Sequence, residues 1–242
     1  EPATMFDIAR QVETVLQYWK ENFHSEKSNI RSVHINYMAK GELLLNENLC
    51  SSFALLSHFT DRQVENYVYA SVKHKVSTIM PTGVNEQMVI NVQKYAEIYY
   101  SLYSVDPAFR KRWLPKAMPV GAALAIIMRN DITIHHALIR DENDRALDAI
   151  GIIDTIVNYK NAGWGGAIKL NLVVYNPFSD NQGERSDGFS LKRYKDILEV
   201  SGIFKSIKLI PRVGFDVKAS CGMFIDPKDI KVKQNDDEFP NT

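Results

Sequence analysis

Cysteine, net charge and long apolar segments are all scarce in this sequence. Its two cysteines, Cys50 and Cys221, cannot form a disulfide scaffold or by themselves complete a four-thiolate zinc or iron–sulfur site. This scarcity favours a reducing, cytoplasmic location. The 29 basic and 29 acidic side chains cancel, which argues against a protein that coats nucleic acid by charge alone, although a local basic patch is still allowed. No segment approaches the roughly 20 apolar residues of a transmembrane helix, so no membrane partner is expected.

What is present is typical of a folded globular domain. Of the 242 residues, 45% are apolar and 24% are charged. A chain of this length can bury roughly 70% of the surface that it exposes when unfolded. Because the sequence has no internal repeat and no linker, we predict one domain over residues 1–225 and a polar tail over residues 226–242. The chain starts with Glu-Pro-Ala rather than Met, and we interpret it as a trimmed or partial chain.

Segments with strand character alternate with segments of helical periodicity. Strands are predicted over residues 33–38, 75–80, 97–103, 132–139, 167–175 and 205–210, and helices over residues 5–19, 49–60, 85–94, 120–130, 146–159 and 191–200. Residues 40–48 are expected to form a loop, and residues 106–119 an irregular basic stretch. This alternation favours an α/β fold in the form of a partial (β/α) barrel with mostly parallel strands. In such folds the chemistry lies at the carboxyl ends of the strands.

Three stretches resemble one known family in order and spacing. The first is Tyr37-Met38-Ala39-Lys40-Gly41-Glu42-Leu43-Leu44-Leu45-Asn46. The second is the strand 132–139 with Asn143-Asp144 behind it, continued by residues 169–178. The third runs from residue 194 to residue 222 and ends in Ala219-Ser220-Cys221-Gly222. Together they are similar to the radical-SAM RNA adenine C2-methyltransferases of the dual-specificity type, which act on ribosomal and transfer RNA.

The resemblance implies a reaction and its cofactors. The family methylates carbon 2 of adenine with S-adenosylmethionine (SAM), a [4Fe–4S] cluster and an electron donor for that cluster. A cysteine that SAM first methylates carries the methyl group, and Cys221 matches it. The family's CxxxCxxC cluster loop is absent from this sequence, so the resemblance implies that a missing N-terminal segment supplies the cluster. The alternative is a degenerate relative that has lost the cluster.

The resemblance also implies cofactor contacts at the strand ends. Gly41 and Glu42 match the residues that hold the amino group of SAM, and Ser77, Ser101 and Asn176 match residues that contact SAM elsewhere. Each residue also has a plain structural interpretation. Glu42 can be a solvated loop acid, Ser77 and Ser101 ordinary strand-end serines, Asn176 a turn residue before proline, and Cys221 a small buried thiol.

Several positions depart from the family pattern. Leu43 stands where the family has proline, and Tyr103 stands where it has histidine. His135 and His136 replace an acidic–aromatic pair. Phe215 and Lys218 replace acidic residues near the terminal motif. These departures support a second hypothesis, in which the chain is a non-enzymatic relative that binds RNA or a protein partner. A third hypothesis is another radical-SAM reaction on the same scaffold.

One basic stretch is the best candidate for an RNA contact. It contains Arg110, Lys111, Arg112 and Trp113 behind a predicted strand end. Single-stranded RNA is held by phosphate contacts together with stacking on aromatic side chains, which this composition can supply. The alternative interpretation is a solvated charged loop.

No metal site is predicted within this chain. His135 and His136 are adjacent on a predicted strand, so their side chains face opposite sides and cannot ligate one ion together. His74 stands between two lysines, which suggests a solvated edge. Cys50 lies on a predicted helix and is expected in the core.

Overall fold

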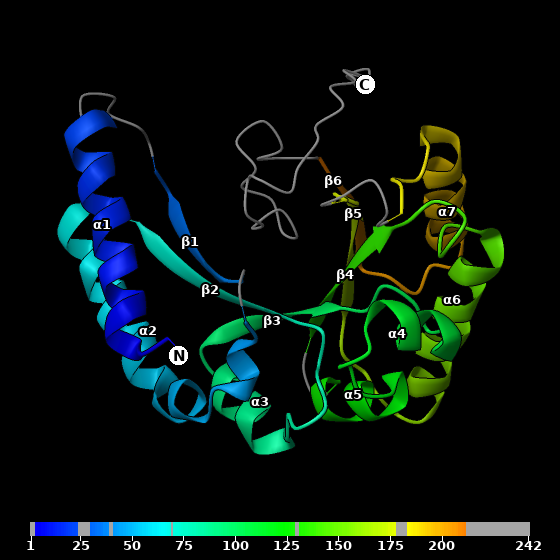
Figure 1. Cartoon of the computed structure of the whole chain (residues 1–242), viewed down its shortest axis with the longest axis horizontal. Helices are drawn as coiled ribbons and strands as arrows, with labels where there is room; N and C mark the ends of the chain where they lie inside the picture. The colour runs from blue at the N-terminus through cyan, green and yellow to red at the C-terminus, as the bar shows by residue number, and fades with distance from the viewer. Residues whose placement is uncertain are drawn as a thin grey trace.

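The sheet is a single layer of parallel strands that curls into a half-barrel (Figure 1). The computed structural model describes residues 3–23, 30–38, 41–68, 70–128, 131–177 and 183–211. Within these residues the strand order is β1-β2-β3-β4-β5-β6, and every neighbouring pair is parallel. The strands are β1 (Ser32–Tyr37), β2 (Ser71–Thr78), β3 (Ala96–Ser101), β4 (Ile132–Leu138), β5 (Ile168–Val174) and β6 (Ser206–Ile210).

Helices connect successive strands and cover the outer side of the curled sheet (Figure 1). They are α1 (Met5–Phe23), η1 (Leu43–Leu45), α2 (Glu47–Tyr67), α3 (Glu86–Gln93), α4 (Pro107–Trp113), α5 (Val120–Ile127), α6 (Ala146–Asn161) and α7 (Gly188–Val200), where η1 is a short 3-10 helix. Helical crossovers are what parallel strands require, because a tight turn cannot join two parallel strands. None of the helices that the structure describes is long and apolar enough to cross a membrane.

The core lies between the sheet and its outer helices. Along β5, Ile168, Leu170 and Leu172 are fully buried, whereas Lys169 and Asn171 between them are only half-buried. Alternation of this kind places apolar side chains against the helices and polar side chains on the concave side of the sheet. The concave face of the half-barrel is therefore polar, which leaves it available for chemistry.

The predicted α/β half-barrel is confirmed, with each of the six strands within a few residues of its expected bounds. The expected irregular stretch was wrong in part, because residues 107–113 form α4. Asp106 caps this helix by accepting hydrogen bonds from the main-chain amides of Ala108 and Phe109, and Pro107 opens its first turn. The tail over residues 226–242 lies outside the described residues, so the domain bounds stay a prediction.

Candidate functional site

The carboxyl edge of the half-barrel brings together the residues expected to hold a cofactor. Gly41 and Glu42 follow β1, Ser77 lies one residue before the end of β2, and Ser101 is the last residue of β3. Asn176 follows β5 by two residues. Because parallel strands end at the same edge, these residues share one rim although up to 135 positions separate them in the chain, from 41 to 176.

Left-handed backbone is concentrated along this rim. Gly41 has a φ of 97°, and the non-glycine residues Met80, Tyr103 and Asp141 have φ values of 53°, 58° and 59°. They follow β1, β2, β3 and β4 respectively, so four neighbouring strand ends each turn through this sparsely populated region. Such conformations cost energy outside glycine and persist where the surrounding structure holds them, which is common at binding and catalytic sites.

The Glu42 carboxylate links the ends of β1 and β2. One carboxylate oxygen accepts a hydrogen bond from the Leu44 amide at 3.4 Å, and the other accepts from the Ile79 amide at 3.3 Å. Burial raises the pKa of Glu42, and hydrogen bonds from the Thr78 side chain and these amides offset the rise only partly. The two oxygens have about four lone pairs between them, so the fixed carboxylate can still accept a bond from an ammonium group.

Cys50 lies in the first turns of α2 and is buried, as predicted for a core residue. Its Sγ lies 3.6 Å from the carbonyl oxygen of Leu43 and 3.7 Å from that of Leu44. Burial, together with the charges of Glu42 and Glu47, raises the pKa of the Cys50 thiol to about 11. The protonated thiol that results is a poor nucleophile and a poor metal ligand.

Arg110 does not face RNA, which corrects its prediction as an RNA contact. Its side chain is 5% exposed. The guanidinium donates to the main-chain carbonyl oxygens of Leu102 at 2.7 Å, Ser104 at 3.3 Å and Met118 at 3.1 Å. The sequence pattern missed this because consecutive residues of a helix point to different sides, so three consecutive basic residues do not reveal which one is buried.

The other members of the basic stretch lie at the surface beside the rim. Lys111 is exposed, and Arg112 forms an ion pair with Glu142 in the turn after β4. The Trp113 indole nitrogen donates to the same carboxylate at 3.3 Å. Its ring lies 6.2 Å from the ring of Tyr175, which directly follows β5. Lys111, Arg112 and Trp113 therefore remain candidates for contacting RNA.

A polar network centred on Glu97 fills the concave face below the rim. Its carboxylate accepts hydrogen bonds from Thr133 Oγ1 at 2.7 Å, Lys169 Nζ at 3.2 Å and the Tyr99 hydroxyl at 3.3 Å. Lys75 lies over the Tyr99 ring at 5.3 Å. Burial alone would raise the pKa of Glu97, but the hydrogen bonds from Thr133, Lys169 and Tyr99 and the charge of Lys169 together outweigh burial and lower it. Sequence reasoning missed this network, because its members are spread over four strands.

The adjacent histidines of β4 face opposite sides, as predicted. His135 lies on the concave face, where its Nε2 is 2.8 Å from Asn171 Nδ2, and burial and the charge of Lys75 lower its pKa to about 4. His136 is fully buried on the helix side, where its Nε2 is 2.9 Å from the Tyr194 hydroxyl, and burial lowers its pKa to about 3. Both imidazoles are therefore neutral near pH 7.

The prediction that His74 lies at a solvated edge was wrong. His74 is 7% exposed, with Nδ1 3.0 Å from the Tyr37 hydroxyl and Nε2 2.8 Å from Asp61 on α2. Successive side chains of β2 point to opposite faces of the sheet, so His74 faces the helices while its lysine neighbours face the concave side. Among the described residues, no group of three His, Cys, Asp or Glu side chains could hold a metal ion. Cys221 lies outside the described residues.

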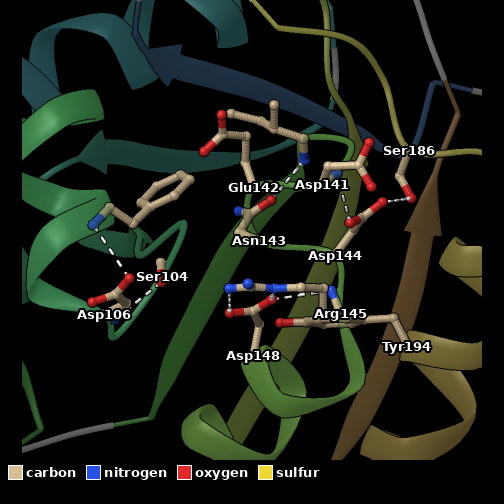
Figure 2. Close-up of polar contacts among 12 residues, drawn as sticks. Ser104, Asp106, Asp141, Glu142, Asn143, Asp144, Arg145, Asp148, Ser186 and Tyr194 are labelled. Atoms are coloured by element: carbon tan, nitrogen blue, oxygen red, sulfur yellow. Dashed lines mark hydrogen bonds and ion pairs between the residues drawn. The ribbon is translucent and has the colours of Figure 1, made fainter.

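The turn between β4 and α6 contributes two buried polar residues for which sequence reasoning named no role (Figure 2). Asn143 and Asp144 belong to the stretch that carries the resemblance. Asp144 accepts hydrogen bonds from the Asp141 amide at 2.9 Å and the Ser186 hydroxyl at 2.7 Å. An Asn-Asp pair shortly after a strand end is the signal that could have identified a turn held by side-chain hydrogen bonds.

Comparisons with known proteins find sequence relatives that share one name, and solved structures that share the fold. No family model matches the chain. It is 26% identical over 201 residues to a protein of Thermosipho melanesiensis named a probable dual-specificity RNA methyltransferase RlmN, covering 80% of this chain and 55% of that protein. It is 25% identical over 230 residues to the dual-specificity RNA methyltransferase RlmN of Pseudomonas fluorescens, covering 88% of this chain and 56% of that protein. The chain thus spans about half the length of the curated relatives it matches.

Two solved structures share the fold. A radical SAM methyltransferase from Sphaerobacter thermophilus superposes with a TM-score of 0.67 at 18% identity, covering 91% of this chain and 61% of that chain. A domain of pyruvate-formate lyase-activating enzyme from Bacteroides vulgatus superposes with a TM-score of 0.52 at 15% identity, covering 73% of this chain and 98% of that domain. At these identities the likeness concerns the fold alone. The sequence resemblance and the half-barrel are both confirmed by these matches.

Proposed function

We propose that this chain, a relative of the dual-specificity RNA methyltransferases with the half-barrel of a radical SAM methyltransferase, belongs to an enzyme that methylates RNA by radical-SAM chemistry. One observation carries the proposal. The residues that match the family's SAM contacts, namely Gly41, Glu42, Ser77, Ser101 and Asn176, lie along one rim of the half-barrel. Side chains from separate strands that converge on one edge are what a single binding site requires.

The rim residues fit SAM. Glu42 offers a carboxylate that hydrogen bonds already orient, and it suits the ammonium group of the methionine part. Gly41 has left-handed backbone, and a Cβ added there would meet no heavy atom within 4 Å, so its role is conformational. Ser77 and Ser101 would supply hydroxyl groups, and Asn176 an amide. When bound, SAM supplies the methyl group and the precursor of the radical.

The residues of this chain do not fit the iron–sulfur cluster. A [4Fe–4S] cluster is held by cysteine thiolates, and the sequence has two cysteines. Cys50 is a buried thiol whose pKa is raised to about 11. The proposal therefore assigns the cluster ligands, and the docking of an electron donor, to protein outside these 242 residues. We derive no step through the cluster.

The finer proposal concerns the substrate atom and the methyl carrier. Carbon 2 of adenine is electron-poor, so a direct polar transfer of the methyl group from SAM is disfavoured. A methyl group tethered to Cys221 would present the carbon atom to the base at a fixed position, which replaces a bimolecular encounter by a positioned one. Lys111, Arg112 and Trp113 beside the rim would contact RNA through phosphate pairing and stacking.

A second candidate function rests on the departures from the family pattern. With Leu43, Tyr103 and the His135–His136 pair at positions where the family has other residues, the half-barrel can instead be a binding module for RNA or a protein partner. The two functions differ in their need for iron, SAM and Cys221.

The test uses the longest natural form of the protein, purified without oxygen. Iron and sulfide content, SAM affinity and transfer of labelled methyl from SAM to RNA are measured for the wild type, Cys221→Ala and Glu42→Gln. We expect Glu42→Gln to weaken SAM binding at least tenfold, and Cys221→Ala to abolish RNA methylation while iron content and SAM binding stay unchanged. Glu47→Gln, an exposed acid in the first turn of α2, is the matched control. A protein that binds RNA but holds no iron after reconstitution would favour the binding module.

A further inference from the structure

Two buried side chains, from α4 and from the turn after β4, donate hydrogen bonds to the main chain at the end of β3. We propose that Arg110 and Asn143 are positioning residues that fix residues 101–104, so that Ser101 and Tyr103 are presented to the cofactor at the rim. The inference rests on the proposed function, because it assigns the β3 end to the SAM site. It explains why a guanidinium and an amide are buried beside the rim when neither is expected in a core.

Asn143 ties the end of β3 to the end of β4. Its side chain is fully buried. The amide nitrogen donates to the carbonyl oxygens of Tyr103 at 2.6 Å and Ala137 at 2.9 Å, and the amide oxygen accepts from the Ile139 amide at 2.7 Å. The register between the two strands ends at Ser101 and His135, so the Asn143 side chain continues the connection beyond the last paired residues.

Arg110 holds the same segment from α4. Its guanidinium donates to the carbonyl oxygens of Leu102 and Ser104, the residues on either side of Tyr103. The three consecutive carbonyls of residues 102–104 are thus all engaged by buried side chains, two by Arg110 and one by Asn143. Arg110 also donates to the carbonyl oxygen of Met118, which connects its side chain to the segment before α5.

The backbone conformation of residues 102–104 is unfavourable without these hydrogen bonds. Tyr103 has a φ of 58°, which is unfavourable for a tyrosine, and the Ser104 amide bonds back to the Leu102 carbonyl at 2.7 Å. A tight turn of this kind relaxes when its outside partners are removed. The turn that carries Asn143 is itself braced, because Asp144 binds the Asp141 amide and Ser186 (Figure 2).

Arg110 and Asn143 direct their donors to main-chain carbonyls, so they would affect SAM binding indirectly, by fixing the position of the β3 end. Loss of either one would remove side-chain donors from buried carbonyls and let the segment leave its left-handed turn. The rim hydroxyl of Ser101, and Tyr103 at the position where the family has histidine, would then lose their fixed place. Weaker SAM binding and faster local opening should therefore appear together.

The test measures both properties on the longest natural form of the protein, reconstituted with iron and sulfide without oxygen. Local opening is read by hydrogen–deuterium exchange of a peptide covering residues 101–106, and the dissociation constant of SAM by calorimetry. Asn143→Asp keeps the size and the acceptor but cannot donate to the two carbonyls. Arg110→Lys keeps the charge but cannot reach three carbonyls at once. Tyr194→Phe is the matched control, because it removes one buried hydrogen bond, to His136, and none of the bonds to residues 101–104.

In Asn143→Asp and in Arg110→Lys, we expect the amides of residues 101–106 to exchange at least tenfold faster and SAM to bind at least tenfold more weakly. Tyr194→Phe should change neither quantity by more than threefold. Faster exchange with unchanged SAM affinity would overturn the inference, as would a control that weakens SAM binding equally. Failure of the proposed function has a different signature, because the wild-type protein would then bind no SAM before any substitution is made. If Asn143→Asp does not fold, Arg110→Lys alone decides the outcome.

Discussion

Replacing Glu97 by glutamine should destabilise the half-barrel by removing the centre of its concave network. Glu97 accepts hydrogen bonds from Thr133, Lys169 and Tyr99. These bonds connect β3 to its neighbour β4 and, across it, to β5. Glutamine can keep its oxygen toward Thr133 and Lys169, but its NH2 group then replaces the oxygen that accepts from the Tyr99 hydroxyl, and the ion pair with Lys169 is lost. The network would therefore lose charge and at least one bond at once.

The expected magnitude follows from the exposure of the partners. A hydrogen bond to a charged group contributes about 1.5–3 kcal/mol when buried. The Glu97 side chain is 34% exposed and that of Lys169 is 41% exposed, so solvent screening reduces the ion-pair part. We take about 2 kcal/mol for the whole substitution, which corresponds to a fall of about 4–8 °C in the melting temperature for a domain of this size.

The pH dependence of this loss gives a second readout. The folded-state pKa of Glu97 lies below its ordinary value, so its stabilising contribution is present above the unfolded pKa of about 4.3 and is lost as the pH falls through the folded pKa. The stability gap between the wild type and Glu97→Gln should hold from pH 7 to about pH 4.3 and narrow below it, as the pH falls through the folded-state pKa.

The assay is urea unfolding followed by circular dichroism from pH 7 down to about pH 2. Glu65→Gln is the matched control, because Glu65 forms an exposed ion pair with Arg62 at 3.3 Å, and exposed pairs contribute about 0–1 kcal/mol. A gap below about 0.5 kcal/mol at pH 7, or one that does not change with pH, would refute the assignment of Glu97 as the ionised centre of the network.

Three further predictions concern other parts of the fold. Burial lowers the pKa of His136 to about 3, so its stabilising contribution is present above about pH 6.5 and is lost, by about 1.4 kcal/mol per pH unit, as the pH falls. The double variant His136→Phe with Tyr194→Phe should lack this slope in urea unfolding. Gly183→Ala should cost about 2–3 kcal/mol, because its Cβ would lie 2.8 Å from an isoleucine methyl, whereas Gly202→Ala, with open space, should cost about 1 kcal/mol in the same assay. Asp106→Ala should cost about 1 kcal/mol by removing the cap of α4, and an unchanged melting temperature would contradict that role.

Much of the fold could be predicted because local signals carry it. The strand segments are rich in β-branched and aromatic residues, the helical segments repeat at helical spacing, and parallel crossovers follow from their alternation. Helix α4 was missed although Asp106 and Pro107 form a cap and a first turn, because the basic residues behind them were interpreted as a loop. The short helix η1 lies inside the expected loop, where Glu42 caps it.

The rim residues could be predicted, but their partners could not. Gly41, Glu42, Ser77, Ser101 and Asn176 were found through the resemblance and the rule that parallel strands end at one edge. The Glu42 contact with the Ile79 amide, 37 positions away, has no local signature. Nor does the bond between Lys169 and Glu97, which are 72 positions apart.

The amino-acid sequence by itself determined the order of the strands and of the longer helices, the parallel sheet and the residues that reach its carboxyl edge. These properties depend on periodicity and on short motifs, which neighbouring residues encode. Only the tertiary structure decided which polar side chains are buried and what they bind. Arg110 lies under the β3 end, His74 under α2 and Asn143 between two strand ends. The physical reason is that a buried polar group is tolerated only where hydrogen-bond partners converge on it, and these partners reach it only once the chain has folded.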